Sequence, residues 1–239
     1  MDCLFVHVPK FKNYYRPIGE YTFINYLPMG VLALADLLAR GGYETEVLHL
    51  GVEWIEDKGF SLIDYIAQKR PRVVALSLHW HPQSYEVLEQ ARMIKEAFPE
   101  ISIILGGLTA SFFHREIMER FPWVDAIIRG EGEVPLLQVM EAIIKGGVLQ
   151  TVPNLTWRQG KKVCENPLAY CASQEILDGL VLAKGEDMRR YPLEERIAMY
   201  RPAMNRLKKV CGVALCEETP EAWDALGLDK EAKRCNCAL

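Results

Sequence analysis

Five short apolar segments alternate with segments of helical periodicity along the first 150 residues of the chain. The apolar segments are residues 3–8, 45–50, 73–78, 102–105 and 126–128. The third and fourth are apolar at nearly every position, which is typical of parallel strands that helices cover on both faces. Strands that alternate with helices in this way predict βαβ units with right-handed crossovers, and therefore a parallel sheet.

Five such strands predict a doubly wound α/β fold of the flavodoxin-like (Rossmann-like) type, with a five-stranded parallel sheet in the order 2-1-3-4-5. In a sheet of this kind the ligand crevice lies outside the carboxyl ends of the strands, centred between strands 1 and 3. Farther along, residues 154–158 and 161–164 flank Gln159-Gly160 and predict a β-hairpin. We therefore expect an α/β domain (1–150), a hairpin with a connector (151–185), and a mainly helical, cysteine-containing tail (186–239).

Charge and composition argue against several classes of partner. The net charge of −4 gives no electrostatic reason to expect nucleic acid or an anionic membrane. No apolar run reaches the roughly 18 residues of a membrane-spanning helix. The first six residues read as a strand, without the basic start of a signal peptide. The seven cysteines are an odd number, which disfavours a disulfide scaffold. We expect a cytoplasmic protein.

Four loops are predicted to reach the crevice, because each follows the carboxyl end of a strand. The first, residues 9–29, exceeds the roughly 15 residues above which a loop inside a compact domain is usually functional. Glycines in the third and fourth loops let the backbone approach a ligand closely, while His79 and Trp80 in the second can ligate, donate hydrogen bonds or stack. The candidate cofactor-binding residues are Pro28, Met29, Gly30, Ser77, Leu78, His79, Trp80, Gly106, Gly107, Leu108, Thr109, Gly130, Glu131 and Gly132.

Each loop also has a purely structural interpretation. Gly106 and Gly107 can form a tight strand-to-helix turn, and Trp80 can plug the end of the sheet. For Glu133, N-capping of the following helix is favoured over contact with a ligand. The case for a ligand site is that all four loops converge on one crevice. Neither GxGxxG nor GxxxxGK[ST] occurs in the sequence, so the dinucleotide fingerprint and the ATP P-loop are missing.

Several segments of the chain match a known family in their order. They are residues 27–30 (LPMG) with 33–35 (ALA), 42–47 (GYETEV), 74–77 (VALS), 104–110 (ILGGLTA), 129–133 (RGEGE) and 154–158 (NLTWR). This combination resembles the N-terminal domain of cobalamin-dependent radical S-adenosylmethionine (radical SAM) enzymes. The resemblance covers roughly residues 1–170.

The resemblance implies a flavodoxin-like domain that holds the corrin ring of cobalamin over the carboxyl ends of the strands, with the nucleotide tail buried in the sheet. The residues it places along the tail and the ring edge are Ser77, Gly106, Gly107 and Thr109, with Gly130 and Glu131 beside them. The Asp-x-His-x-x-Gly motif that supplies a lower axial histidine in other cobalamin proteins is absent. A variable side chain then meets the lower face of the ring. The candidates are His79, Trp80 and His81, and the first two are favoured.

The sequence departs from this family in its catalytic half. The CxxxCxxC motif, which in the family binds the [4Fe–4S] cluster that cleaves S-adenosylmethionine, does not occur. The region after Tyr170 is also too short for the partial barrel that carries this motif, while residues 191–239 resemble the closing segment of some radical SAM proteins. The resemblance therefore implies a cobalamin domain joined to a tail, without the catalytic core. Such a chain is either a natural reduced form or a separately encoded subunit, which would act with a separate radical SAM or methyltransferase partner. It leaves open whether S-adenosylmethionine binds to this chain.

The tail has its own candidate metal ligands. Four of the seven cysteines fall in the last 29 residues: Cys211, Cys216, Cys235 and Cys237. Thiolates at these positions have the chemistry to bind zinc or an iron–sulfur cluster, although Cys-x-Cys is tighter than the usual zinc-knuckle spacing.

The leading hypothesis is a cobalamin-binding module related to cobalamin-dependent radical SAM methyltransferases, which holds the corrinoid for methyl transfer or radical chemistry carried out with a partner. Two alternatives stay open. One is a self-contained iron–sulfur or metal enzyme that uses the tail cysteines. The other is a regulatory or scaffold protein that keeps the fold without the cofactor. The sequence leaves open whether the chain is itself an enzyme.

Overall fold

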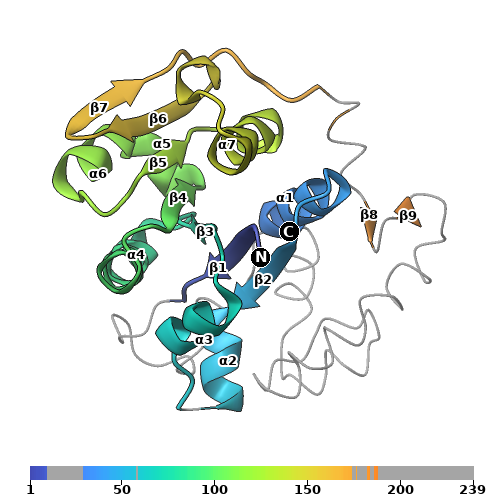
Figure 1. The fold of residues 1–239 in the computed structure, drawn as a ribbon, viewed down its shortest axis with the longest axis vertical. Helices are drawn as coiled ribbons and strands as arrows, with labels where there is room; N and C mark the ends of the chain where they lie inside the picture. Colours follow the sequence, from blue (N-terminus) through green and yellow to red (C-terminus); the bar gives the residue numbers. More distant parts are fainter. Residues whose placement is uncertain (10–28, 58, 174–175, 177–181, 184–185, 188–239) are drawn as a thin grey trace, which may run out of the picture. The chain divides into compact units, whose positions relative to one another are not determined.

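Seven strands form one mixed sheet in the order β2-β1-β3-β4-β5-β6-β7 (Figure 1). The computed structural model describes residues 1–9, 29–57, 59–173, 176, 182–183 and 186–187 of the chain. The strands of the sheet are β1 (Cys3–His7), β2 (Thr45–His49), β3 (Val73–Ser77), β4 (Ser102–Gly106), β5 (Ala126–Ile128), β6 (Leu155–Gln159) and β7 (Lys162–Glu165). The first five pair in parallel, whereas β6 and β7 are antiparallel.

The predicted order 2-1-3-4-5 occurs among the parallel strands, but the prediction of a five-stranded sheet was wrong. The hairpin continues the sheet, because β6 pairs with β5 and places Trp157 opposite Ala126. Leu155 and Trp157 are buried in the core on one face of the sheet. Burial of these two side chains is the physical reason that the hairpin joins the sheet rather than standing apart from it.

The hairpin turn falls one residue later than predicted. Gln159 pairs with Lys162, so the two turn residues are Gly160 and Lys161 rather than Gln159 and Gly160. Gly160 has a φ of 60°, and tight two-residue hairpin turns favour glycine at such a position.

Helices cover both faces of the sheet, as the prediction of a doubly wound fold requires. In Figure 1, α1 and α7 lie on one face, and α3, α4 and α6 lie on the other. The helices are α1 (Met29–Arg40), α2 (Leu50–Glu56), α3 (Leu62–Lys69), α4 (Ser84–Ala97), α5 (Leu108–Phe112), α6 (His114–Arg120) and α7 (Glu133–Lys145), with 3₁₀ turns η1 (His81–Gln83) and η2 (Leu149–Thr151).

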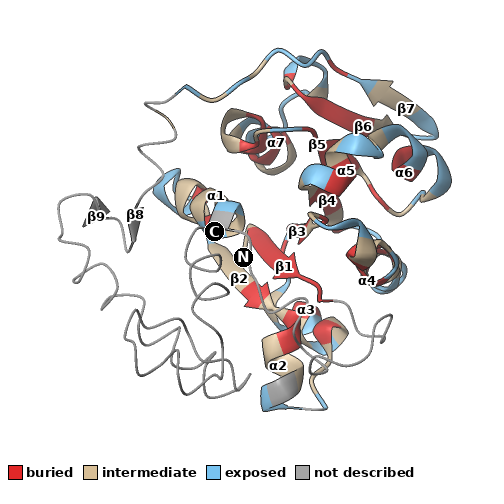
Figure 2. Ribbon diagram, turned by 180° about the vertical axis from the view of Figure 1, so that it is seen from behind, coloured by how far each residue is buried: buried red, intermediate tan, exposed pale blue. Residues whose placement is uncertain are grey.

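The alternation of side chains along the strands divides the core into two layers. In β1, Leu4 and Val6 pack with α3, α4 and α6, whereas Cys3 and Phe5 pack with α1 and α7. Figure 2 shows the buried strands between helices whose outer sides are exposed. A strand buried on both faces has to be apolar at successive positions, which explains the continuous apolar runs in the sequence.

Arg129, directly after β5, ties the hairpin to the parallel part of the sheet. Its side chain is 5% exposed, and its Nη1 lies 2.8 Å from Oε1 of Glu165. The guanidinium also donates to the carbonyl oxygens of Asn154 (3.3 Å) and Asn166. Burial lowers the pKa of Arg129, while the hydrogen bond from Arg115 holds the pKa of Glu165 below its usual value. The buried guanidinium is thus compensated by a carboxylate and by backbone oxygens.

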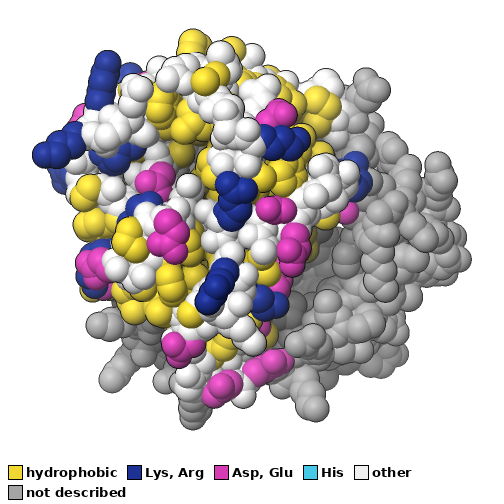
Figure 3. All heavy atoms as spheres, in the orientation of Figure 1, with side chains coloured by type: hydrophobic (Ala, Val, Ile, Leu, Met, Phe, Trp, Pro, Cys, Tyr) yellow, Lys and Arg dark blue, Asp and Glu magenta, His cyan; other side chains and the backbone are white. Residues whose placement is uncertain are grey.

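Charged side chains of both signs are interspersed among apolar ones on the described face that Figure 3 shows. The described helices carry ion pairs between neighbouring turns, such as Arg92 with Glu96 at 2.6 Å on α4. Exposed pairs of this kind contribute little to stability because solvent screens them. The buried apolar layers therefore account for most of the stabilisation of the fold.

Beyond the hairpin, the described residues include a second, two-stranded sheet of β8 (Leu182–Ala183) and β9 (Glu186–Asp187). Nearly all of the predicted helical tail, 186–239, lies outside the described residues, and the boundaries of the three predicted segments stay predictions. Within the described ranges, no helix is long and apolar enough to cross a lipid bilayer. The cytoplasmic location also stays a prediction.

Candidate functional site

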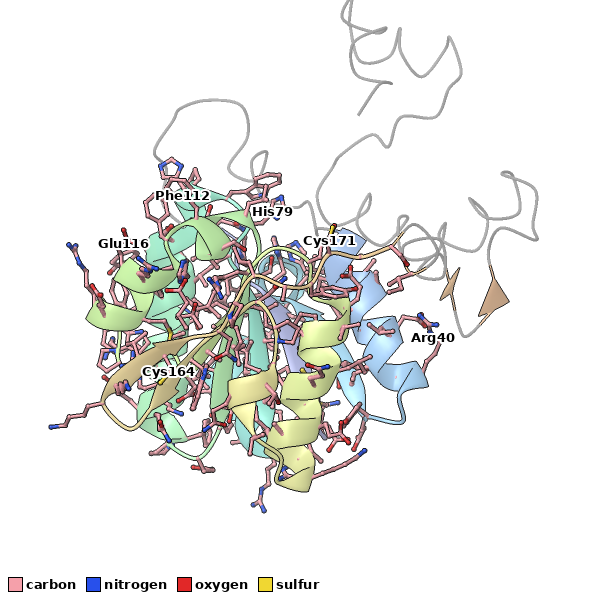
Figure 4. The ribbon with its side chains drawn as sticks, turned by 90° about the horizontal axis from the view of Figure 1, so that it is seen from above. Arg40, His79, Phe112, Glu116, Cys164 and Cys171 are labelled. Carbon is pink, nitrogen blue, oxygen red and sulfur yellow. The ribbon has the colours of Figure 1, made fainter. Side chains whose placement is uncertain are left out.

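The carboxyl ends of β3, β4 and β5 meet at one edge of the sheet, because these strands are parallel neighbours. In Figure 4, His79, Phe112 and Cys171 lie along this edge. His79 follows β3, Phe112 ends the helix after β4, and Cys171 belongs to the segment beyond the hairpin. The three predicted loops that follow β3, β4 and β5 therefore begin at the same edge, while most of the first loop, residues 10–28, lies outside the described residues.

Ser77 and Gly106 form the floor of the candidate site. They are register partners at the last positions of β3 and β4. Ile104 packs in the layer of α1 and α7, and side chains alternate along a strand, so Gly106 faces the same side. Among the residues that the structure describes, a Cβ placed on Gly106 would meet no atom within 4 Å. The backbone of β4 therefore borders open space on the side of α1 and α7.

Two more candidate glycines border open space. Gly30 lies in the first turn of α1, and Gly130 follows β5 with a φ of 70°. In the described part of the chain, no atom lies within 4 Å of a Cβ added to either glycine. Gly132 differs, because its Cβ would lie 3.4 Å from Cδ1 of Leu34 in α1. A Cβ at this distance would make an ordinary van der Waals contact with Leu34, so Gly132 borders α1 rather than open space.

Gly107 has a structural reason to be glycine. Its φ is 105°, and an added Cβ would lie 2.7 Å from the carbonyl oxygen of Leu78. The loops after β3 and β4 are this close because the Leu78 N–H donates to the Gly106 carbonyl at 2.8 Å. The side chain of Leu78 is fully buried in the core. The tight-turn interpretation therefore suits Gly107, whereas Gly106 has the free space that the ligand interpretation needs.

Thr109 joins the loops after β3 and β4. Its hydroxyl donates to the carbonyl oxygen of His79 at 2.9 Å, and its oxygen can still accept a hydrogen bond. Thr109 is buried, but its neighbour Leu108 is 65% exposed. The first turn of α5 thus combines a fixed hydroxyl with an exposed apolar side chain.

The rings of His79 and Trp80 form an edge-to-face pair with centroids 4.1 Å apart. Burial lowers the pKa of His79, which favours the neutral imidazole at neutral pH. Trp80 is 37% exposed, and His81 is exposed at the start of η1. All three candidates for the lower face of the ring therefore lie in the loop after β3, with different degrees of exposure.

Glu131 and Glu133 hold the segment beyond the hairpin. The Ala172 N–H donates to the Glu131 carboxylate, and the hydroxyl of Tyr170 donates to Glu133 at 3.5 Å. Hydrogen bonding with Glu131 raises the pKa of the Cys171 thiol. The prediction that Glu133 caps α7 was wrong, because Gly132 is the N-cap and no side chain makes a capping hydrogen bond there.

Gln83 and His7 are site neighbours that the sequence analysis missed. Gln83 is fully buried, and its amide donates to the Val8 carbonyl at 2.9 Å and accepts from the Trp80 N–H at 3.3 Å. It therefore fixes the loop after β3 to the end of β1. His7, at the last position of β1, is fully buried with its ring 4.7 Å from that of His49. A histidine within an apolar run was the available signal for His7, whereas Gln83 reads as an ordinary loop residue.

The remaining candidates are described in part or not at all. Pro28 lies outside the described residues, and of Met29 the structure describes the backbone at the start of α1. Within the described ranges, no group of three or more His, Cys, Asp or Glu side chains is arranged to hold a metal ion. The four tail cysteines, Cys211, Cys216, Cys235 and Cys237, lie outside those ranges.

A comparison with known protein families identifies the domain that contains this edge of the sheet. A sequence profile described as the B12 binding domain matches residues 22–140. Residues 22–140 belong to the B12-binding domain family. The matched range of this B12-binding domain contains the floor residues Ser77 and Gly106, and it extends from before α1 into α7. The predicted resemblance to an N-terminal cobalamin-binding domain is thereby confirmed.

Proteins similar to this chain include a cyclase and a cobalamin-dependent radical SAM methyltransferase. The anaerobic magnesium-protoporphyrin IX monomethyl ester cyclase of Rubrivivax gelatinosus is 29% identical over 183 residues, which are 77% of this chain and 29% of that protein. The cobalamin-dependent radical SAM methyltransferase TokK of Streptomyces tokunonensis is 28% identical over 163 residues, 66% and 23% of the two chains. This chain therefore spans less than a third of each of these relatives.

The fold is also shared with a solved structure. The radical SAM methyltransferase TsrM from Kitasatospora setae, with cobalamin and a [4Fe–4S] cluster bound, superimposes with a TM-score of 0.57 at 21% identity. The match covers 78% of this chain and 31% of TsrM. At this level of identity the likeness shows the fold alone.

Proposed function

We propose that this chain is a cobalamin-binding module that holds a corrinoid at the carboxyl edge of its sheet, for methyl transfer or radical chemistry carried out with a partner protein. The observation that carries the proposal is the space that the described residues leave open over Gly106 and Gly130, at the ends of neighbouring strands. A large ligand can approach a backbone closely where side chains are missing. The position also agrees with the general location of ligand sites in sheets of this type.

The residues around this space fit a corrinoid. Leu108 and Trp80 are 65% and 37% exposed and offer apolar surface to a flat macrocycle, while Ser77 offers a hydroxyl at the floor. The residues that would hold the tail and the ring edge are Ser77, Gly106 and Thr109, with Gly130 and Glu131 beside them, while the turn at Gly107 fixes the backbone next to Gly106. Bound cobalamin would supply a cobalt centre able to carry a methyl group. The residues of the chain would bind and orient that cofactor.

The partner in this proposal is a separate radical SAM or methyltransferase subunit. The sequence lacks CxxxCxxC, whereas the relative TokK is named a cobalamin-dependent radical SAM methyltransferase. We infer that S-adenosylmethionine and the [4Fe–4S] cluster belong to the partner. The module would then present the corrinoid to a catalytic centre that the partner carries.

Cobalamin uptake tests the proposal directly. The chain, mixed with excess hydroxocobalamin and passed through gel filtration, is expected to elute with bound corrinoid, because the described residues leave the space over the two glycines open. The measurement is corrin absorption in the protein peak. A protein that elutes colourless at every cobalamin concentration would contradict the proposal and favour the scaffold alternative. Iron and sulfide analysis after anaerobic reconstitution tests the tail cysteines separately.

We also propose that Trp80, rather than His79, covers the lower face of the ring. The Trp80 indole is the more exposed of the two, and the imidazole of His79 packs against it. Trp80→Ala is expected to weaken cobalamin binding about tenfold through loss of aromatic contact and to shift the corrin absorption bands. The matched variant His81→Ala is expected to change neither property. A spectral shift in His79→Ala that is absent in Trp80→Ala would assign the lower face to His79 instead.

A further inference from the structure

Ser111, in α5, hydrogen-bonds to two loops of the site at once. Its hydroxyl donates to the Gly107 carbonyl at 2.8 Å and accepts from the Gly130 N–H at 2.9 Å. Its own N–H also donates to the Gly107 carbonyl, at 2.9 Å. The Ser111 hydroxyl therefore connects the loop after β4 to the loop after β5.

The loop after β5 is held at three successive residues. Before Gly130, the Arg129 N–H donates to the Asn154 carbonyl at 2.9 Å. After it, the Glu131 carboxylate accepts from the Ala172 N–H. Gly130 itself has no side chain and has a φ of 70°, so its backbone is conformationally permissive. The bond to Ser111 is the contact that holds the Gly130 N–H.

Thr109 provides the corresponding link on the other side of α5. Its hydroxyl joins the loop after β4 to the His79 carbonyl. Two hydroxyl groups of one short helix thus connect the three described loops of the site. Thr109 is a candidate ligand contact in its own right, whereas Ser111 reaches the site through Gly130 and Gly107.

We propose that Ser111 is a positioning residue for the corrinoid, which holds the Gly130 backbone in place beside the Gly107 turn before the ligand arrives. This inference rests on the proposed function. A loop that is already ordered loses less conformational freedom on binding, so pre-organisation increases affinity. Without the hydroxyl, the Gly130 backbone is free to move in the apo chain. Its conformational entropy would then be lost when the ligand binds, which lowers the affinity.

The test combines hydrogen exchange of the apo chain with cobalamin titration. In Ser111→Ala, amide exchange at Gly130 is expected to rise, and cobalamin affinity is expected to fall about tenfold, in line with the loss of a few ordinary hydrogen bonds. Ser111→Thr is expected to restore both, because a threonine hydroxyl in a helix also bonds to the carbonyl four residues earlier. Rescue by threonine assigns the effect to the hydroxyl group.

Ser61→Ala is the matched control. In the wild-type chain, Ser61 is the N-cap of α3, and its hydroxyl accepts a hydrogen bond from the Asp64 N–H at 3.2 Å. Helix α3 lies on the face of the sheet opposite α1 and α7. This variant is expected to lose stability with unchanged cobalamin affinity. The inference is overturned if Ser111→Ala binds cobalamin as tightly as the wild-type chain, or if Ser61→Ala weakens binding equally. A wild-type chain that takes up no cobalamin overturns the proposed function and this inference with it.

Discussion

Gly106→Leu is expected to weaken cobalamin binding by about 100-fold or more, equivalent to about 2.7 kcal/mol, while the fold stays intact. A Cβ on Gly106 meets no described atom within 4 Å, so we expect the described part of the apo chain to tolerate a side chain there. It would fill the space in which we place the corrinoid. Titration followed by corrin absorption measures the loss, and denaturant unfolding measures whether stability is unchanged.

The adjacent glycine is the matched comparison. Gly107 has a φ of 105° and a ψ of 171°, a region that essentially only glycine occupies, and side chains there cost about 1–3 kcal/mol. Its Cβ would also come within 2.7 Å of the Leu78 carbonyl oxygen. Gly107→Ala is therefore expected to lower the free energy of unfolding. Undiminished cobalamin binding by Gly106→Leu would show that the open space is not the ligand site.

Arg129→Met is expected to lower the free energy of unfolding by about 3 kcal/mol. The variant removes a buried charge whose partners stay in place, and uncompensated polar groups of this kind are costly. The Asn166 carbonyl would lose the guanidinium as a donor, and Glu165 would lose one of its two arginines. The Asn154 carbonyl would keep the backbone N–H of residue 129 as its donor. Urea or guanidinium denaturation with a fixed slope measures the change.

Arg115→Met offers a control with the same residue type and the same partner. Arg115 also pairs with Glu165, at 2.8 Å, but its side chain is 67% exposed. Solvent screens an exposed pair, so we expect little change in the free energy of unfolding. If both variants lowered the free energy of unfolding equally, the loss would come from the ion pair with Glu165 and not from the burial of Arg129.

Local periodicity was sufficient to predict the parallel part of the sheet. Short apolar runs separated by helices leave few possible strand orders once crossovers are right-handed. The place of the hairpin was not predictable in this way. It depends on Leu155 and Trp157 packing in the layer of α1 and α7, and no local pattern contains that long-range contact.

The candidate site was also predictable only in part. Because loops that follow parallel strands share an edge, the convergence of the described loops could be predicted. The different roles of Gly106 and Gly107 could not, since their difference comes from the Leu78 carbonyl, which lies far away in sequence. Ser111 gave no signal either, because a serine after a glycine turn resembles any solvent-facing residue until its two partners are known.

The hairpin also determines which strand lies at this edge of the sheet, where another chain could pair with it. Without it, the outermost strand would be β5, which is three residues long and buried throughout. With it, the outermost strand is β7, whose two ends, Lys162 and Glu165, are charged and exposed. Unpaired apolar edges invite pairing with other chains, and charged edge strands discourage it. We therefore expect the hairpin to reduce aggregation, and a chain cut at residue 150 to aggregate more readily because β5 would then lie at the edge of the sheet.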